Sequence, residues 1–282
     1  MKIAFLVLVF LSATWALPKG EVRNLYPPFK RLYVDTLQSA FKPVDSRIVN
    51  GHEVVPHSIP YQALLIISGE YGKYMCGGFL ISPKFVLTAG HCINGANSSL
   101  VHLGAHDIVY KEDTQRIING DKFILHEEFD EATSTNDIGI IELSEEVVPN
   151  HYISIAPLPS RGSYNRTYED KVVRVQDSVV GGYTCGTGSD SEVLLEANAT
   201  VIKNDLCKAF YQIVEDSNIC TGGDEGITSC SGDSGGPLVV GNEVIGIVSF
   251  GVKDCVQGFP SGYTRIDSYF DWIEEHTGQL FF

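Results

Sequence analysis

Short apolar runs with the composition of β-strands recur along the chain from residue 61 onward. They are rich in Val, Ile, Leu and Tyr, and Gly, Asn, Asp or Pro separates them. The runs cover residues 61–68, 85–89, 100–105, 116–125, 137–143, 171–180, 193–202, 237–240, 243–250 and 262–266. Gly241-Asn242 has the composition of a two-residue hairpin turn. Because no helical period intervenes, the pattern predicts an all-β fold, built as antiparallel barrels or a sandwich.

One helix is predicted, at the C-terminus. Ser268 precedes Asp271 by three positions, which is the spacing of a capping box at a helix start. Phe270 and Trp272 give the segment an apolar surface, and Gly278 has the residue type that ends helices. We therefore expect a helix that begins after Ser268 and ends at Gly278.

The start of the chain has a different pattern. Lys2 precedes a short apolar segment, and small residues follow it up to Ala16. This arrangement predicts a secretory signal peptide over residues 1–16, because the apolar segment is too short to span a bilayer. Residues 17–47 contain Pro-Pro and scattered charges without a sustained period, and we interpret them as a leader before the folded domain. The sequence thus predicts a secreted, extracellular protein.

Acidic residues outnumber basic residues. The chain has 35 Asp and Glu against 20 Lys and Arg, and its formal net charge is −15 at pH 7. This charge argues against nucleic acid and anionic membranes as partners, since both attract cationic surfaces. Three Asn-x-Ser/Thr sequons are candidate glycosylation sites if they are exposed: Asn97, Asn165 and Asn198.

The cysteine content of an exported chain indicates disulfide bonds. There are seven cysteines, so at least one lies outside the intramolecular pairs. Six cysteines still allow many pairings, and spacing alone does not fix the connectivity. No Cys-x-x-Cys occurs, and the histidines are not spaced near cysteine pairs. We therefore expect no structural zinc.

Three residues in distinctive local contexts have the types that a nucleophilic serine site requires. A serine hydroxyl needs a base within hydrogen-bond reach, and the base needs a third group that fixes its tautomer and orientation. His91 lies in LTAGHC at the end of an apolar run, Asp137 opens the run DIGIIEL, and Ser234 lies in GDSGGP. Each one alone is compatible with a plain structural role. Together, in a secreted β-rich chain, they predict a Ser-His-Asp site.

Several motifs carry a resemblance to a known family. IVNG, LTAGHC, NDIGIIEL, CSGDSGGP, SFG and PSGYTRI follow one another in the order found in the chymotrypsin family of serine endopeptidases. From Ile48 onward the chain resembles this family, and it is most similar to the secreted chymotrypsin-like proteases of invertebrates. The resemblance implies two antiparallel six-stranded β-barrels with a C-terminal α-helix. The peptidase domain would cover residues 48–282, with one barrel over 48–155 and the second barrel plus the helix over 156–282.

The family's mechanism implies a role for each residue of the motifs. Ser234 attacks the peptide carbonyl, His91 takes its proton and later protonates the leaving amine, and Asp137 stays ionised and orients His91. The backbone N–H groups of Gly232 and Ser234 form the oxyanion hole. No cofactor and no metal is implied, because Ala105 stands where calcium-binding members have a carboxylate.

The resemblance also implies synthesis as an inactive zymogen. A trypsin-like protease would cleave behind Arg47 and remove the activation propeptide, residues 17–47. The new amino group of Ile48 would then pair with Asp233, and this pair would order the oxyanion loop. Self-activation is not expected if the enzyme's own pocket rejects Arg.

Three disulfides are implied by the same resemblance, each closing a short loop near the active centre. Cys185 is then unpaired, in a segment where the family usually has Gly-Trp-Gly and Tyr183 stands roughly for the Trp. The shape of this loop is therefore left open. The implied pairs are Cys76–Cys92, Cys207–Cys220 and Cys230–Cys255.

The specificity pocket follows from the same alignment. Thr228 stands at the floor, where trypsin-like enzymes carry an aspartate, Gly251 leaves the mouth open, and Ser261 narrows the wall. An uncharged, open pocket implies cleavage after large or medium apolar residues. The alternatives are an elastase-like preference, because Thr228 and Ser261 both shrink the pocket, and a broad or collagenolytic one. The segment Ser249, Phe250 and Gly251 would pair with the substrate backbone as an extra strand.

The expected partners are protein or peptide substrates, an activating trypsin-like protease and protein protease inhibitors, and we expect a monomer. Two other function classes stay open. A non-catalytic homologue would only bind partners, but such proteins usually lack a triad residue or the oxyanion glycine. A regulatory protease of a body-fluid cascade often carries disulfide-rich modules, whereas the leader here is short and has no cysteine. A simple secreted, digestive enzyme is therefore favoured.

Overall fold

The computed structural model describes residues 51–70, 72–108, 110–163, 166–177, 193–223, 229, 232–252 and 258–280. Several predicted features lie outside these residues: the signal peptide and propeptide, Arg47, Ile48, Asn165, Cys185, Thr228, Cys230 and Cys255. In the described part, no helix has the length and apolar character that crossing a membrane requires.

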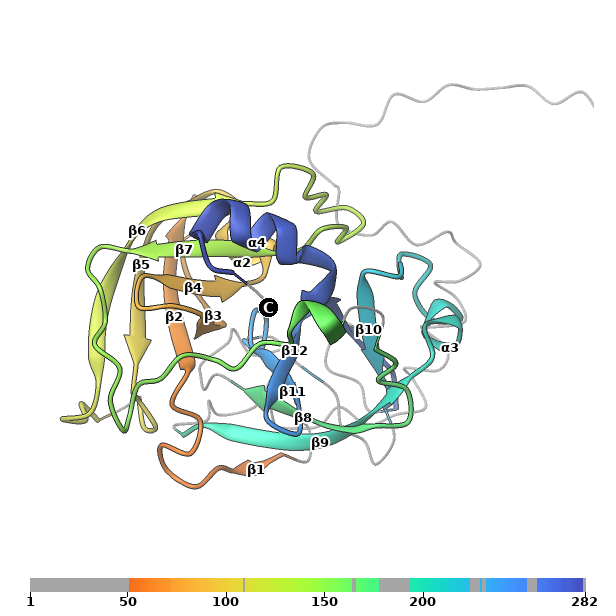
Figure 1. Ribbon diagram of the computed structural model, residues 1–282, viewed down its shortest axis with the longest axis horizontal. Helices are drawn as coiled ribbons and strands as arrows, with labels where there is room; N and C mark the ends of the chain where they lie inside the picture. The colour runs from red at the N-terminus through yellow and green to blue at the C-terminus, as the bar shows by residue number, and fades with distance from the viewer. Residues whose placement is uncertain are drawn as a thin grey trace, which may run out of the picture.

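Six antiparallel strands close the first barrel (Figure 1). The sequence of strand β5 suits a barrel wall. Val101 and Leu103 are fully buried, whereas Leu100, which directly precedes Val101, is exposed, as is Asn97. Successive side chains of a strand point to opposite faces, so one face fills the core and the other meets solvent. In barrel order the strands are β2 (Gln62–Gly69), β3 (Gly72–Leu80), β4 (Phe85–Thr88), β7 (Gly139–Leu143), β6 (Arg116–Leu125) and β5 (Ala96–Leu103).

Six further strands form the second barrel, whose core includes Val173, Leu238 and Tyr263. Their order is β8 (Val172–Asp177), β9 (Leu195–Ile202), β10 (Asn218–Thr221), β13 (Ser261–Arg265), β12 (Glu243–Phe250) and β11 (Pro237–Val240), and β11 pairs back with β8. The short strand β1 (His52–Glu53) pairs with β9 at the outer edge. The predicted class of two antiparallel six-stranded barrels with a C-terminal helix is therefore confirmed.

Short helices connect the strands and follow the last one. They are α2 (Gly90–Ile93), α3 (Asn204–Lys208) and α4 (Phe270–Thr277), with the 3-10 turns η1 (Arg161–Ser163) and η4 (Ile266–Tyr269). Figure 1 shows α4 lying over the first barrel, although its chain enters from β13 of the second. Phe270 and Ile273 of α4 are buried in the same apolar cluster as the first barrel's core. This helix therefore fastens the two barrels together.

The predicted bounds of the C-terminal helix are right, but the predicted capping box at Ser268 is wrong. Ser268 lies inside η4, which runs directly into α4. Tyr269, the residue before α4, makes no side-chain hydrogen bond that caps the helix. With helical backbone on both sides, Ser268 has no helix start to cap, and Asp271 instead pairs with Arg161 at 2.6 Å. Gly278 ends the helix with a φ of 68°, and its N–H donates to the carbonyl oxygen of Glu274 at 2.8 Å.

The apolar runs of the sequence all overlap strands, and the Gly241-Asn242 turn joins β11 to β12. The pattern missed β1, β3 and β10, and β3 escaped because its sequence GKYMCGGFL has the glycine content of a loop. At Gly78 a Cβ would lie 2.9 Å from Cγ1 of Val86 and 3.0 Å from the carbonyl oxygen of Leu87. Close packing against β4, rather than strand propensity, therefore requires glycine in β3.

Candidate active site

His91 lies in a helical turn that is fixed on two sides. The turn α2 begins at Gly90, where a Cβ would lie 3.1 Å from the backbone nitrogen of Ile138. The disulfide Cys76–Cys92 ties the same turn to β3, with a Cα–Cα distance of 6.2 Å. The close backbone contact and the disulfide hold the His91 side chain in place while 32% of it remains exposed.

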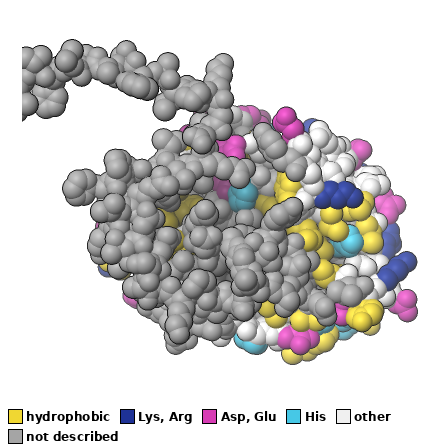
Figure 2. All heavy atoms as spheres, turned by 180° about the vertical axis from the view of Figure 1, so that it is seen from behind, with side chains coloured by type: hydrophobic (Ala, Val, Ile, Leu, Met, Phe, Trp, Pro, Cys, Tyr) yellow, Lys and Arg dark blue, Asp and Glu magenta, His cyan; other side chains and the backbone are white. Residues whose placement is uncertain are grey.

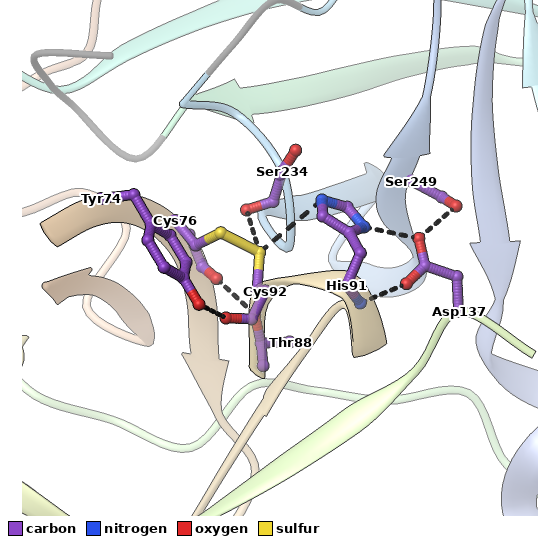
Figure 3. Close-up of a disulfide and its surroundings, with 9 residues drawn as sticks. Tyr74, Cys76, Thr88, His91, Cys92, Asp137, Ser234 and Ser249 are labelled. Carbon is purple, nitrogen blue, oxygen red and sulfur yellow. Dashed lines mark hydrogen bonds and ion pairs between the residues drawn. A yellow bond between two sulfur atoms is a disulfide. The ribbon is translucent and has the colours of Figure 1, made fainter. Parts of the chain in front are cut away.

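Asp137, just before β7, holds His91 by two hydrogen bonds (Figure 3). Its side chain is fully buried; Oδ1 accepts the backbone N–H of His91 at 2.8 Å, and Oδ2 lies 2.8 Å from His91 Nδ1. Ser249 Oγ donates to Oδ2 at 2.6 Å, and Thr264 Oγ1 donates to the Asp137 carbonyl at 2.7 Å. A hydrogen on Nδ1 that points to Asp137 leaves Nε2 able to accept a proton.

The two groups shift each other's pKa. Burial acts to lower the pKa of His91, but the charge of Asp137, the hydrogen bond to it and the charge of Glu131 raise this pKa above its ordinary value. Burial acts to raise the pKa of Asp137, whereas the charge and hydrogen bonds of His91 and the Ser249 hydroxyl hold this pKa below its ordinary value. Asp137 is therefore ionised at neutral pH and stabilises a protonated His91.

Ser234 lies on the opposite side of the His91 ring from Asp137 (Figure 3). Its carbonyl accepts the N–H of Gly77 in β3 at 2.7 Å, so the first barrel holds this loop of the second. Cys92 Sγ lies 3.6 Å from that carbonyl oxygen and 3.8 Å from His91 Nε2. Among the described residues, the Ser234 hydroxyl has no hydrogen bond to His91, and such bonds are often long before substrate binds. The structure thus brings the three predicted residues into one site.

The turn that carries Ser234 requires glycine at two positions. Gly232 has a φ of 104° and Gly235 a φ of 83°, both in the region that favours glycine. A Cβ at Gly235 would also collide with Thr88 Oγ1 and the Gly77 carbonyl oxygen. The backbone N–H groups of Gly232 and Ser234 lie on this turn, and they are the donors that an oxyanion hole here would use.

Asp233 is a completely buried carboxylate beside Ser234. Its carbonyl accepts the N–H of Gly236 at 2.9 Å, which closes the turn. Burial, together with the charge of Asp233, raises the pKa of Tyr263 to about 12 although the hydroxyls of nearby residues lower it. A buried carboxylate is stable only when hydrogen bonds or a cation compensate its lost hydration. The environment of Asp233 therefore suits a positively charged partner.

Ser261, which was predicted to line the specificity pocket, is hydrogen-bonded to Ser229. Ser261 is 1% exposed, and its Oγ accepts the backbone N–H of Ser229 at 3.1 Å. A Cβ at Gly251 would have its nearest neighbours at 3.9 Å, and these are atoms of Ser229. Gly251 therefore lies beside Ser229, and a Cβ there would make ordinary van der Waals contact with it. The ring of Phe250 packs edge-on against Tyr211 at a centroid distance of 5.5 Å, which supports the end of β12.

Two contacts to Asp137 were missed by sequence reasoning. Ser249 was predicted to contribute its backbone to substrate binding, and its hydroxyl donates to Asp137 as well. Thr264 was not singled out. These residues lie 112 and 127 positions from Asp137, and they reach it because β12 and β13 of the second barrel face the first. Both residues lie in motifs of the sequence, Ser249 in SFG and Thr264 in PSGYTRI, but neither motif indicates a contact with Asp137.

Acidic side chains lie close to the site. Asn94, three residues after His91, donates to Glu131 Oε2 at 3.3 Å. In the view of Figure 2, acidic side chains lie at several places on the described surface. The negative charge of Glu131 favours a positively charged His91 imidazole.

The second predicted disulfide within the described residues is also present. Cys207–Cys220 joins α3 to β10 with a Cα–Cα distance of 6.3 Å, and it packs in an apolar cluster with Tyr211. Of the sequon residues, Asn97 on β5 and Asn198 on β9 are exposed, as glycosylation requires.

Comparisons with known proteins identify the family. The sequence model of the trypsin family matches residues 48–273. A chymotrypsin from Phaedon cochleariae is 38% identical over 278 residues, which is 98% of each chain. A brachyurin from Leptuca pugilator is 39% identical over 241 residues, 82% of this chain and 99% of that protein. A solved structure named HL collagenase has a TM-score of 0.74 and 35% identity, and the match covers 82% of this chain and 99% of the other. The chain therefore belongs to the trypsin family and is a serine endopeptidase.

Proposed function

We propose that this serine endopeptidase is secreted as a zymogen and, once activated, cleaves peptide bonds after large or medium apolar residues. The observation that carries the catalytic part is the buried carboxylate of Asp137, which binds both the backbone and the ring of His91 beside Ser234. A base held in one tautomer next to a serine is the arrangement that makes a weak hydroxyl nucleophilic.

In the proposed reaction, Ser234 Oγ attacks the peptide carbonyl carbon, and its proton passes to His91 Nε2. The carbonyl oxygen becomes an oxyanion that accepts the N–H groups of Gly232 and Ser234. Loss of one such donor costs about 3–4 kcal/mol of transition-state stabilisation. His91 then protonates the leaving amine as the C–N bond breaks, which leaves an acyl-serine. A water molecule gives its proton to His91 and attacks the ester, and Ser234 regains the proton as the acid leaves.

Activation by cleavage behind Arg47 is supported by Asp233. Its carboxylate is fully buried next to the nucleophile, where the new amino group of Ile48 would add a positive charge that stabilises the buried negative charge. The trypsin-family match also begins at Ile48. Residues 17–47 would then be the propeptide, and a trypsin-like protease is the proposed activator because the cleaved bond follows an arginine.

The proposed preference for apolar residues is supported by the pocket wall. The Ser261 hydroxyl accepts the backbone N–H of Ser229, so it is neutral and held in place, and the missing Cβ of Gly251 leaves room for a substrate side chain beside Ser229. Apolar pockets discriminate by only about 1–3 kcal/mol per methylene, so related side chains compete. An elastase-like or broader, collagenolytic preference is the alternative, and the relatives include a protein named chymotrypsin and a structure named collagenase.

Secretion is proposed from the signal-peptide pattern of residues 1–16. The two disulfides agree with an oxidising compartment. The family implies protein substrates and protein inhibitors. We propose a monomer, because one chain supplies the described part of the candidate site, and a digestive enzyme, because the leader is short and has no cysteine.

The test is activation of the purified, secreted zymogen by a small amount of trypsin that is then inhibited. Matched peptides with Phe, Leu, Ala or Arg before the scissile bond would be offered. We expect cleavage after Phe and Leu only once Ile48 is the N-terminus. Preference for Ala would indicate the elastase-like alternative, and cleavage after Arg would refute the proposed pocket.

Two variants control this experiment. Ser234→Ala zymogen, treated in the same way, measures the residual trypsin background and should show no turnover of its own. Arg47→Gln should stay inactive after trypsin treatment. An active Arg47→Gln protein would contradict the zymogen proposal, and an active Ser234→Ala protein would contradict the mechanism.

A further inference from the structure

The C-terminal helical segment contacts the loop that carries Asp137. This loop, residues 126–138, connects β6 to β7. Tyr269, the last residue of η4, is 6% exposed, and its hydroxyl donates to Oδ1 of Asn136 at 3.0 Å. Asn136 directly precedes Asp137, so the hydroxyl of Tyr269 reaches the residue before the carboxylate that binds His91.

Asn136 has a left-handed backbone conformation, which hydrogen bonds within its loop hold in place. Its φ is 53°, in the left-handed region that asparagine tolerates better than most residues. The N–H of Ile138 donates to the carbonyl of Asn136 at 2.8 Å, which closes a three-residue turn around Asp137. The Asn136 amide also donates through Nδ2 to the carbonyl of Glu128 at 3.0 Å. The side chain therefore ties the turn both to the loop and to Tyr269.

The position of this turn decides the geometry of the catalytic pair. Asp137 places two different oxygens 2.8 Å from two different nitrogens of His91. A rotation of the turn would break at least one of these contacts, because the His91 backbone is fixed in α2 by the disulfide at Cys92. Misplacement by about 1 Å can lower an enzymatic rate roughly 100-fold.

We propose that Tyr269 and Asn136 are positioning residues, and that the hydrogen bond between them sets the orientation of Asp137 toward His91. The proposal rests on the proposed roles of Asp137 and His91. Tyr269 acts through Asn136 and contacts neither the substrate nor the reacting atoms.

The groups around Tyr269 allow the bond to persist over the working pH range. Burial raises the pKa of Tyr269, and the charges of Glu215 and Asp137 raise it further, against the lowering effect of a hydrogen bond with Ser217, so the hydroxyl remains protonated and able to donate at neutral pH. The ring of His126 packs edge-on against Tyr269 at 5.5 Å. Trp272 and His276 of α4 contact Glu127 in the same loop: Trp272 Nε1 donates to one carboxylate oxygen at 2.8 Å, and His276 Nε2 lies 3.1 Å from the other. The loop is thus anchored to the helical segment at both of its ends.

The test compares two tyrosine-to-phenylalanine variants of the activated enzyme. Tyr269→Phe removes the donor to Asn136. Tyr168→Phe is the matched control, since Tyr168 is 3% exposed and its hydroxyl has no hydrogen-bond partner among the described residues. We expect Tyr269→Phe to lower kcat roughly 10- to 100-fold without a change in KM. Tyr168→Phe should keep the original kcat.

The pH profile separates positioning from a general loss of structure. Asp137 raises the pKa of His91, so a displaced Asp137 should move the acid limb of kcat/KM to lower pH in Tyr269→Phe. Unchanged kcat, or a lower kcat with the acid limb in its original place, would overturn the proposal.

A second variant keeps the proposal testable if Tyr269→Phe folds poorly. Asn136→Gly keeps access to the left-handed backbone but removes the acceptor, and it should lower kcat to a similar extent. If the two residues act through one bond, the double variant should be no slower than the slower single variant, whereas independent effects would multiply. Multiplying effects would refute the proposal. Ser234→Ala, which tests the proposed function itself, is expected to be inactive whichever result is found.

Discussion

At the scale of single residues, the proposed catalytic pair combines a buried acid, Asp137, with a partly exposed base, His91. Asp137 receives hydrogen bonds from Ser249 and from both the backbone and the ring of His91. These contacts lower its pKa, although burial alone would raise it. The charge that remains on Asp137 is what raises the pKa of His91.

The first prediction concerns pH. Activity should rise with pH through the pKa of His91, which lies above the ordinary value of 6.5. Asp137→Asn should lower kcat by roughly 10⁴-fold, as is typical of this kind of triad, and should move the acid limb to lower pH. A pH–rate profile of both proteins measures this. A rate that does not change between about pH 5 and 9 would contradict the assignment of His91 as the base.

The same shifts predict how the pair contributes to stability. His91 has a raised pKa in the folded state, so its contribution is complete below pH 6.5 and is lost as pH rises through that raised pKa. Asp137 has a lowered pKa, so its contribution is complete above pH 3.8 and is lost as pH falls through that lowered pKa. Asp137→Asn should therefore destabilise the protein most between these two pH values. Denaturant unfolding across this range would show it.

The second prediction tests the turn that holds Ser234. Gly235→Ala places a Cβ against Thr88 Oγ1 and the Gly77 carbonyl at a φ of 83°, so both strain and collision oppose folding. Gly241→Ala is the control, because Gly241 has a φ of 59° but no atom within 4 Å of the added Cβ. We expect Gly241→Ala to cost about 1–2 kcal/mol and to keep activity. Gly235→Ala should cost more and abolish activity; equal effects in unfolding and peptide assays would refute this.

The residues of the site were predictable to the extent that local motifs mark them. His91, Asp137 and Ser234 each lie in a short distinctive sequence, and Gly232 and Gly235 have the positive φ that a glycine-rich turn suggests. Their partners were not predictable, since hydrogen bonds such as that from Thr264 depend on how distant strands meet. The same applies to the bond between Tyr269 and Asn136, which are 133 positions apart.

At the scale of elements, strands were predicted where apolar side chains alternate or form short runs. β3 escaped because close contact with β4 requires glycine in it. The capping box at Ser268 was wrong because η4 runs directly into α4, so Ser268 lies within helical backbone. In both cases, contacts between elements override the preference of the local sequence.

The third prediction compares the two disulfides. Removing Cys76–Cys92 or Cys207–Cys220 by paired alanine substitutions should cost about 2–4 kcal/mol in each case, because each closes a short loop. Only the first bond holds the turn that carries His91, so only its loss should lower kcat strongly. Thermal unfolding and peptide hydrolysis would be measured on both variants. A similar fall of kcat in both would show that the disulfide next to His91 has no special part in the site.

At the scale of the whole molecule, the site lies where the two barrels meet. His91 and Asp137 belong to the first barrel, and Ser234 and Ser249 belong to the second. The hydrogen bond from Gly77 N–H to the Ser234 carbonyl crosses between the barrels, and so do the bonds to Asp137 from β12 and β13. Rigid docking of the barrels is therefore a condition for the geometry of the site.

The fourth prediction uses Trp272 as a probe of this docking. It is the only tryptophan within residues 48–282, is 8% exposed, and donates to Glu127 of the first barrel. In urea, we expect its emission, the far-ultraviolet circular dichroism and the activity to change in one transition, since the apolar cluster of the first barrel includes α4. A shift in Trp272 emission well before the activity is lost would show that the helix undocks without affecting the site.

The hydrogen bond from Gly77 to Ser234, which joins the two barrels, also has a consequence for copies of this protein that are only partly folded. The proposed base lies in the first barrel and the proposed nucleophile in the second. A copy with only one folded barrel therefore has one of these groups without the other, and it cannot hydrolyse a peptide. Peptide hydrolysis thus requires that both barrels are folded and docked. Partly folded copies, which are the easiest to digest, therefore do not cleave other copies while they are themselves most susceptible to proteolysis.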